Sequence, residues 1–291
     1  MKTLVVLSTL LAAALAVPTL PLSSVGSGRI VGGVDALPGE FPQICSLQWV
    51  LLTASTHMCG EAKWSLVASC TRTPTNNKNT YSLSIINNNW VLTAAHCLTE
   101  SPNIGRLEVL CGKLNLAITE PNQARVGIAN QVIHDEWVAG GVGPYDIALI
   151  RLSAPLIYNP WIQPVTLPTP GTHPTGAATI IGWGNTATGQ IPNNPDILQK
   201  APVPIIAYAQ CRAALEALNA GHVFSDDKIC TGPLTGGISA CSGDSGSPVL
   251  QGNTQVGIVS WGFIPCGGAG APSVHMRVSH FIGWINTIIA N

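Results

Sequence analysis

Ser245 stands between glycines in the run Gly-Asp-Ser-Gly-Ser-Pro at 243–248, shortly after Cys241. A tight turn built on glycine can present the serine hydroxyl and two backbone N–H groups on one side of the chain. An acyl-transfer nucleophile needs this arrangement, because the hydroxyl attacks while the N–H groups stabilise the developing oxyanion. The same residue types also dominate ordinary surface turns. The motif alone leaves a nucleophile and a simple turn as equal interpretations.

Two distant segments supply the partners that a serine nucleophile needs. His96 lies in Thr-Ala-Ala-His-Cys at 93–97, and Asp146 lies in Tyr-Asp-Ile-Ala-Leu-Ile at 145–150. In isolation, a structural histidine and a turn former at a strand end would explain them better. Together with the serine motif, and in the same chain order, they resemble the trypsin/chymotrypsin family of serine endopeptidases. The resemblance extends over residues 30–291 and is closest to chymotrypsin-like members.

The resemblance implies a role for each residue in peptide-bond hydrolysis through an acyl-enzyme. Ser245 would be the nucleophile, and His96 would take its proton and later give it to the leaving amine, while Asp146 holds the imidazole in the required tautomer. The N–H groups of Gly243 and Ser245 would form the oxyanion hole, where each donor is worth about 2.7–4 kcal/mol. The main alternative is a catalytically impaired relative that acts as a binding protein. A secreted inhibitor or lectin-like β protein would leave the three residues unexplained.

The same resemblance places the primary specificity pocket. Its floor lies six residues before the nucleophile, at Ser239, where trypsin-like members carry the aspartate that selects Arg or Lys. The segment 260–262 (Ser260, Trp261 and Gly262) would form the edge that pairs with substrate backbone. Gly262 would keep the mouth of the pocket open, while Ser273 would make the base shallower. We expect an uncharged, chymotrypsin-like slot for Phe, Tyr, Leu or Met, with an elastase-like preference for smaller residues as the alternative.

The start of the chain has the form of a secretory signal followed by a leader. Lys2 precedes an apolar run from Leu4 to Leu15, and Ala-Leu-Ala at 14–16 has the form of a cleavage site. We expect residues 1–16 to be a signal peptide. Residues 17–29 are rich in Pro, Ser and Gly, and we expect them to be an exposed activation propeptide.

Arg29 and Ile30 open the segment Arg-Ile-Val-Gly-Gly at 29–33. In the resembled family an activating protease cleaves after such a basic residue, and the freed amine pairs with the aspartate before the nucleophile, here Asp244. Depriving a buried charge of its partner costs about 3–5 kcal/mol, which is enough to disorder an active-site loop. The sequence therefore predicts a zymogen, and a flexible tail is the alternative.

Short apolar runs broken by Gly, Pro and Asn recur along the rest of the chain and predict an all-β protein. The resemblance implies two six-stranded antiparallel barrels, about 30–155 and 156–291, with the active site between them and a C-terminal helix. The expected strands are 43–52, 90–94, 106–111, 131–134, 147–152, 178–182, 248–250, 255–261 and 273–278. We expect helices at 209–218 and 279–289, with Ser279 as the N-cap of the second.

Nine cysteines behind a signal peptide indicate an oxidising compartment and a disulfide framework. The resemblance implies three pairs: Cys59–Cys97, Cys211–Cys230 and Cys241–Cys266. We further infer that Cys45 pairs with Cys111, because they lie on strands expected to be neighbours. A Cα separation beyond about 7 Å would exclude that bond. Cys70 is left over.

Residues 61–82, which contain Cys70, interrupt the strand that in the resembled family runs directly toward the histidine segment. The stretch 71–80 is rich in Asn, Thr and Lys and has no strand alternation. One hypothesis is a retained intron that preserves the reading frame, which transcript sequencing would test. The alternative is a tolerated surface loop, because longer loops add little closure entropy.

The composition of the chain excludes some classes of binding partner. Only 9% of the residues are charged, the net charge is -1 and there are no basic runs, which argues against nucleic-acid binding. No later stretch approaches twenty apolar residues, so we expect no membrane span. Lys113 stands where calcium-binding members of the resembled family begin an acidic loop, so we expect no metal and no cofactor. We expect a secreted, extracellular monomer of digestive role, whose partners are peptide or protein substrates, an activating protease and protein inhibitors.

Overall fold

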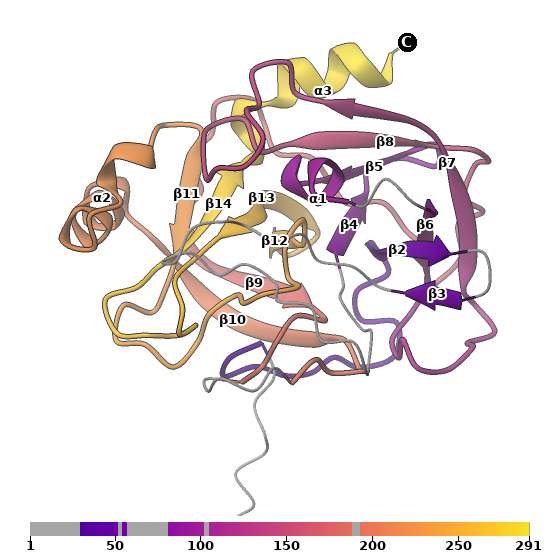
Figure 1. Cartoon of the computed structure of the whole chain (residues 1–291), viewed down its shortest axis with the longest axis horizontal. Coiled ribbons are helices and arrows are strands. Elements are labelled where there is room, and N and C mark those ends of the chain that lie inside the picture. Colours follow the sequence, from indigo (N-terminus) through magenta and orange to yellow (C-terminus); the bar gives the residue numbers. More distant parts are fainter. Residues whose placement is uncertain (1–29, 52–53, 57–80, 102–104, 188–192, 291) are drawn as a thin grey trace, which may run out of the picture.

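The computed structural model describes residues 30–51, 54–56, 81–101, 105–187 and 193–290 (Figure 1). Within these residues the chain forms two antiparallel sheets, and each closes on itself as a six-stranded barrel with one extra strand at its edge. The all-β prediction with two barrels is thus confirmed. None of the helices in the described ranges is long and apolar enough to cross a membrane.

The first barrel has the strand order β2-β4-β5-β8-β7-β6 and closes where β6 pairs with β2. Its strands are β2 (Ile44–Leu51), β4 (Tyr81–Ile85), β5 (Trp90–Thr93), β6 (Arg106–Cys111), β7 (Ala124–Ile133) and β8 (Ala148–Leu152). The short β3 (Ala54–Thr56) pairs with β2 outside the ring. Leu83, Val91 and Leu149 are fully buried in its core. Each such aliphatic side chain contributes about 1.5–3 kcal/mol by leaving water.

The second barrel has the order β9-β10-β11-β14-β13-β12 and closes where β12 pairs with β9. Its strands are β9 (Gly176–Gly182), β10 (Gln199–Ile206), β11 (Lys228–Thr231), β12 (Pro248–Gln251), β13 (Thr254–Trp261) and β14 (Ser273–Arg277). The extra strand β1 (Val34–Asp35) pairs with β10. Its core contains Ile180, Val203 and Val249, all at most 2% exposed.

The chain crosses between the barrels at both ends. Ile30, which is fully buried, packs in the core of the second barrel, although it precedes the first barrel in sequence. At the other end, α3 (Ile282–Ile289) packs Ile282 and Ile285 into the core of the first barrel. The six strands of each barrel lie on either side of residue 155, whereas the apolar side chains at the two ends are buried by the opposite half.

The helices follow the sequence pattern except at one cap. The α2 helix (Tyr208–Ala217) lies within one residue of the predicted range, and the four-residue α1 (His96–Thr99) was not expected. A 3₁₀ turn precedes α3, which begins at Ile282. The predicted N-cap at Ser279 is wrong, because its hydroxyl donates to the carbonyl of Thr172 instead.

Three disulfides are present among the described cysteines. Cys211 joins Cys230, and Cys241 joins Cys266. Cys45 joins Cys111 with Cα atoms 4.2 Å apart, because the two residues are direct partners in the β2–β6 register. Cys97 is a buried free thiol. Its expected partner Cys59 lies outside the described residues, as does Cys70, so the Cys59–Cys97 bond stays a prediction.

Strand β4 begins inside the expected insertion. Tyr81 pairs with Leu47, and Ser82 pairs with Ser46, so these two residues belong to the barrel. Residues 61–80, together with the expected signal peptide and propeptide at 1–29, lie outside the described residues and stay predictions.

Candidate active site

His96 and Asp146 are brought together by two paired strands. Thr93 at the end of β5 lies opposite Ala148 at the start of β8. The backbone N–H of His96 donates to Asp146 Oδ1 at 2.9 Å, and the ring Nδ1 lies 2.7 Å from Oδ2. A carboxylate can only accept, so Nδ1 carries the proton and Nε2 is left as the proton acceptor.

Burial and charge act against each other on this pair. The Asp146 side chain is 2% exposed and that of His96 is 13% exposed. Burial raises the pKa of Asp146. The His96 charge and the hydrogen bonds lower it by more, so the net pKa is below its ordinary value. Burial lowers the pKa of His96, but the charges of Asp146 and Cys97 outweigh it and the net value is well above the ordinary one. The two groups therefore stabilise each other as an ion pair when the imidazole is protonated.

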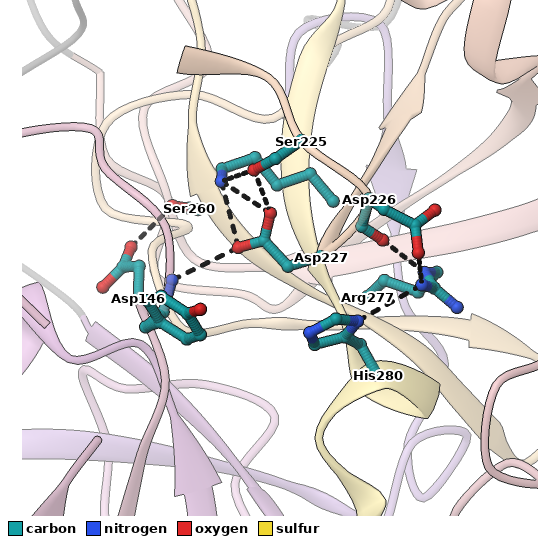
Figure 2. Close-up of polar contacts among 9 residues, drawn as sticks. Asp146, Ser225, Asp226, Asp227, Ser260, Arg277 and His280 are labelled. Atoms are coloured by element: carbon teal, nitrogen blue, oxygen red, sulfur yellow. Dashed lines mark hydrogen bonds and ion pairs between the residues drawn. The ribbon is translucent and has the colours of Figure 1, made fainter. Parts of the chain in front are cut away.

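Ser260 is a third partner of the carboxylate. Its hydroxyl donates to Asp146 Oδ2 at 2.5 Å from β13 of the other barrel (Figure 2). The sequence indicated only a substrate-binding edge at this position. A serine before Trp-Gly gives no sign of contact with an aspartate far earlier in the chain, so this role needed the tertiary structure.

Ser245 lies in the turn between β11 and β12, where neighbouring glycines allow a close approach to the first barrel. Gly246 has φ +77°, and a Cβ there would lie 2.2 Å from Thr93 Oγ1 and 2.3 Å from the carbonyl oxygen of Ser82. Only glycine fits such a contact. The N–H of Ser82 donates to the carbonyl of Ser245 at 3.0 Å. The serine turn is thereby held against β4, through Ser82, and against Thr93 of β5, the strand that leads into His96.

The hydroxyl of Ser245 is half-buried. Within the described residues no hydrogen bond joins it to the His96 ring, whose Nε2 lies 3.9 Å from Cys97 Sγ. Catalytic hydrogen bonds are often long before substrate binds and tighten in the complex. Gly243, the other predicted oxyanion residue, is buried with φ +94° in the same turn.

A narrow slot of about 20 Å³ opens beside Ser245. It is lined by Ala240, Cys241, Ser242, Ser245, Val259, Ser260, Trp261 and Gly262. At Gly262 a Cβ would be 4.0 Å from its nearest neighbour, the Cα of Ser273, so this wall is uncrowded.

Ser239 and Ser273 form a closed hydrogen-bonded group next to the slot. The Ser239 hydroxyl donates to the carbonyl of Ala240 at 2.6 Å and lies 2.9 Å from Ser273 Oγ. Ser273 Oγ also accepts the N–H of Ala240 at 3.2 Å. Since the Ser239 proton is already used, Ser273 donates to Ser239. Both hydroxyl protons are therefore engaged, and this group carries no charge.

A larger apolar cavity of about 610 Å³ adjoins the slot, with Trp261 in the wall of both. The segment 138–143 lines one side, and residues 218–223 line the other together with Phe263. Val138 is 77% exposed there. Apolar side chains could leave water in this cavity without needing a polar partner.

Asp244 is buried behind the serine turn. Its Oδ1 accepts the N–H of Gly184 at 2.8 Å, and its Oδ2 accepts the N–H of Cys241 at 2.9 Å. Within the described part of the chain no cation pairs with it. Burial raises the pKa of Asp244 to about 7, although the two N–H donors act in the opposite direction.

Ile30 is anchored near the same loop. The carbonyl of Val31 accepts the N–H of Ser239 at 3.2 Å, and Gly32, with φ +75°, packs so closely on Gly237 that a Cβ would lie 2.2 Å from its oxygen. Ile30 itself has φ +49°, which is a genuine outlier for a β-branched residue. Arg29, the other predicted activation residue, lies outside the described residues.

The family model described as Trypsin matches residues 30–285. The chain belongs to the trypsin family of serine proteases. It is similar to Trypsin-1 of Astacus astacus, with 34% identity over 88% of this chain and 98% of that protein. It is also similar to Serine protease 1 of Rattus norvegicus, with 38% identity over 72% and 80% of the two chains, and to Anionic trypsin of Canis lupus familiaris, with 32% identity over 90% of each.

Lys113 is buried in this member of the trypsin family. Its ammonium group donates to the carbonyl of Ile118 and, at 3.0 Å, to Gln123 Oε1. Glu120 Oε2 lies 3.5 Å away. The oxygens of Ile118, Gln123 and Glu120 therefore face the Lys113 ammonium group.

Proposed function

We propose that the protein is a secreted serine endopeptidase, made as a zymogen, that cleaves peptide bonds through Ser245, His96 and Asp146. The observation that carries this proposal is the 2.7 Å contact between His96 Nδ1 and Asp146 Oδ2 beside the glycine-rich serine turn. It fixes the tautomer in which Nε2 can accept the hydroxyl proton.

The reaction would follow two proton transfers. Ser245 attacks the substrate carbonyl while His96 accepts its proton, and the N–H groups of Gly243 and Ser245 stabilise the oxyanion. His96 then protonates the leaving amine. Water then attacks the acyl-enzyme while His96 accepts its proton, and His96 returns that proton to Ser245 as the acid product leaves. Asp146 stabilises the imidazolium in both halves of the reaction.

The environment of Asp244 supports activation by cleavage after Arg29. Among the described residues this buried carboxylate has two neutral donors and no cation, and the amine of Ile30 would supply that cation. Cleavage would also remove the constraint that holds Ile30 at φ +49°. An α-amine titrates near 7.7–8.0, and pairing raises this pKa, so the ordered site would be lost as pH climbs through the raised value.

The uncharged group of Ser239 and Ser273 supports a preference for apolar side chains, because Arg or Lys would find no anion there. We infer a chymotrypsin-like specificity for Phe, Tyr, Leu or Met, with a second apolar residue of the substrate in the cavity behind Trp261. The slot volume of about 20 Å³ favours the elastase-like alternative unless activation widens it.

The test is a kinetic survey of the cleaved protein. We expect kcat/KM on a panel of peptides to be highest for apolar residues before the cut bond, with Ser245→Ala inactive. A clear preference for Arg or Lys would refute the assignment of Ser239. Inactivity of the cleaved chain would favour the binding-protein alternative, and activity gained only on deletion of residues 61–80 would assign the defect to that segment.

A further inference from the structure

Tyr145, the residue before Asp146, is held in an unusual backbone conformation. Its φ is +64°, in the left-handed region that residues other than glycine rarely adopt. Its carbonyl accepts the N–H of Ile147 at 2.7 Å, so Asp146 lies inside a tight turn. Such conformations cost about 1–3 kcal/mol and persist only where the surroundings impose them. Whatever holds Tyr145 therefore also sets where the Asp146 carboxylate points.

Asp227 holds this backbone from the other barrel. Its Oδ2 accepts the N–H of Tyr145 at 3.2 Å, across from the loop that precedes β11 (Figure 2). On the other side, the Tyr145 ring stacks on His134 with centroids 4.7 Å apart and meets the edge of Phe281 at 6.2 Å. The ring contacts fix the side chain, and the hydrogen bond to Asp227 fixes the peptide group.

Lys228 locks the carboxylate that makes this bond. Its ammonium group lies 2.9 Å from Asp227 Oδ1 and 3.0 Å from Oδ2, and the side chains are 0% and 6% exposed. Ser225 also donates to Oδ1 (Figure 2). A buried ion pair is rarely the best way to stabilise a fold, because apolar residues of similar volume do as well. Its direct effect here is to hold Oδ2 facing the Tyr145 N–H.

Arg277 holds the same loop from behind. Its Nε donates to the carbonyl of Asp226 at 2.8 Å, and Nη2 donates to the Asp226 carboxylate at 2.6 Å (Figure 2). Its backbone N–H donates to the carbonyl of Asp227 at 2.7 Å. The loop that carries Asp227 is thus fixed to β14 before it contacts the first barrel.

We propose that Asp227, locked by Lys228, is a positioning residue for the proposed catalytic aspartate. It holds the Tyr145 peptide across the two barrels and thereby aims the Asp146 carboxylate at His96. This inference rests on the proposed function, because it assigns a role in that reaction.

Two double variants isolate the hydrogen bond from the ion pair. Both Asp227→Asn/Lys228→Met and Asp227→Leu/Lys228→Met remove the two buried charges. Only the first keeps an oxygen for the Tyr145 N–H, since its amide can donate to Ser225 while its carbonyl accepts. Ser225 is exposed and can turn to water in the second. The pair therefore differs mainly in the acceptor at residue 227.

We expect the Leu/Met variant to have a kcat about 10²-fold below that of the Asn/Met variant, with KM unchanged, as for a small misplacement of a catalytic group. The acid limb of kcat/KM should also move to lower pH, because weaker contact with Asp146 lowers the pKa of His96. Among the described residues, the titratable groups that act on or contact His96 are Asp146, Cys97, Glu100 and Tyr81. None of them is changed in either variant.

Glu120→Gln is the matched control. Glu120 lies beside the buried Lys113 and accepts the N–H of Leu114 at 2.8 Å. Like Asp227, it is a carboxylate that contacts a buried lysine and holds a backbone N–H, but the N–H belongs to Leu114 and not to Tyr145. Its kcat and acid limb should equal those of the unmodified protein.

Equal kcat and equal acid limbs in the two double variants would overturn the proposal. If the Leu/Met variant does not fold, Asp227→Ala/Lys228→Met takes its place. If neither of these folds while the Asn/Met variant does, the hydrogen bond between Tyr145 and residue 227 serves stability alone, which would also overturn the proposal. An unmodified protein that shows no peptidase activity after cleavage would instead refute the proposed function.

Discussion

Two buried aspartates on either side of the proposed active site have opposite electrostatics. Asp146 and Asp244 are both at most 2% exposed. Asp146 accepts hydrogen bonds from His96 and Ser260, and its pKa lies below the ordinary value. Among the described residues, Asp244 accepts hydrogen bonds from two backbone N–H groups, and burial raises its pKa to about 7. The difference is the cation: within the described part of the chain His96 can supply one to Asp146, whereas none pairs with Asp244.

This contrast separates the part of the site that folding alone completes from the part that we propose is completed by cleavage. The His96–Asp146 pair is built by strand pairing within one barrel, receives contacts from Ser260 of the other barrel, and is complete before any cleavage. The serine turn rests on Asp244, whose neutral form is favoured below about pH 7. Substituting each aspartate separately tests this contrast.

The largest effect is expected from Asp146→Asn. An amide in place of the carboxylate favours the wrong imidazole tautomer, and kcat of the cleaved protein should fall by about 10⁴-fold. Steady-state kinetics on an apolar peptide measure this, with circular dichroism as the control for folding. A loss below tenfold would remove Asp146 from the mechanism.

Asp244→Asn should come next and should act only after cleavage. Loss of the partner of the new amine removes about 3–5 kcal/mol from the ordered site, so kcat/KM of the cleaved variant should fall by about 10²–10⁴-fold. The Asp146→Asn variant is the comparison, since its cleaved form should keep an ordered serine loop. If cleaved Asp244→Asn retains full activity, the amine pairs elsewhere.

Ser260→Ala should have a smaller effect on the first aspartate. It removes one donor to a charged acceptor, a contact worth about 1.5–3 kcal/mol, so kcat should fall by roughly one to two orders of magnitude. The acid limb should shift little, because His96 keeps both of its contacts with Asp146. Unchanged kcat would show that the hydroxyl only fills space.

The smallest effect is the pH dependence of the uncut chain. The folded-state pKa of Asp244, about 7, is above its unfolded value near 3.8, so its contribution to stability is lost as pH rises through 7. Asp146 behaves oppositely: its pKa is lowered, so its contribution is present above the ordinary value and is lost as pH falls through the lowered one. In a Ser245→Ala background the unfolding temperature should drop between pH 5 and pH 8, and adding Asp244→Asn should reduce that drop. An undiminished drop would contradict the assignment to Asp244.

The sequence predicted the two barrels, but it missed two of their strands and the contacts that support the proposed site. Strand β10 was missed because Pro202 and Pro204 argue against a strand. They are tolerated because the chain there pairs with β9 alone, and β11 joins only at Ile205 and Ile206. Strand β11 was missed because Lys228 suggests a solvated position, whereas its ammonium is fully buried on Asp227.

The missed supports share one physical cause. The contacts of Ser260, Asp227 and Lys228 span residues more than 80 positions apart or use charges that normally face water. Local pattern carries no information about such pairs.

The most direct test is covalent labelling of Ser245 by a sulfonyl fluoride before and after cleavage between Arg29 and Ile30. We expect little or no labelling of the uncut chain and stoichiometric labelling of the cleaved one, located at Ser245 by mass spectrometry. Equal labelling of both forms would contradict the role given to Asp244, and no labelling of either would contradict the serine nucleophile itself.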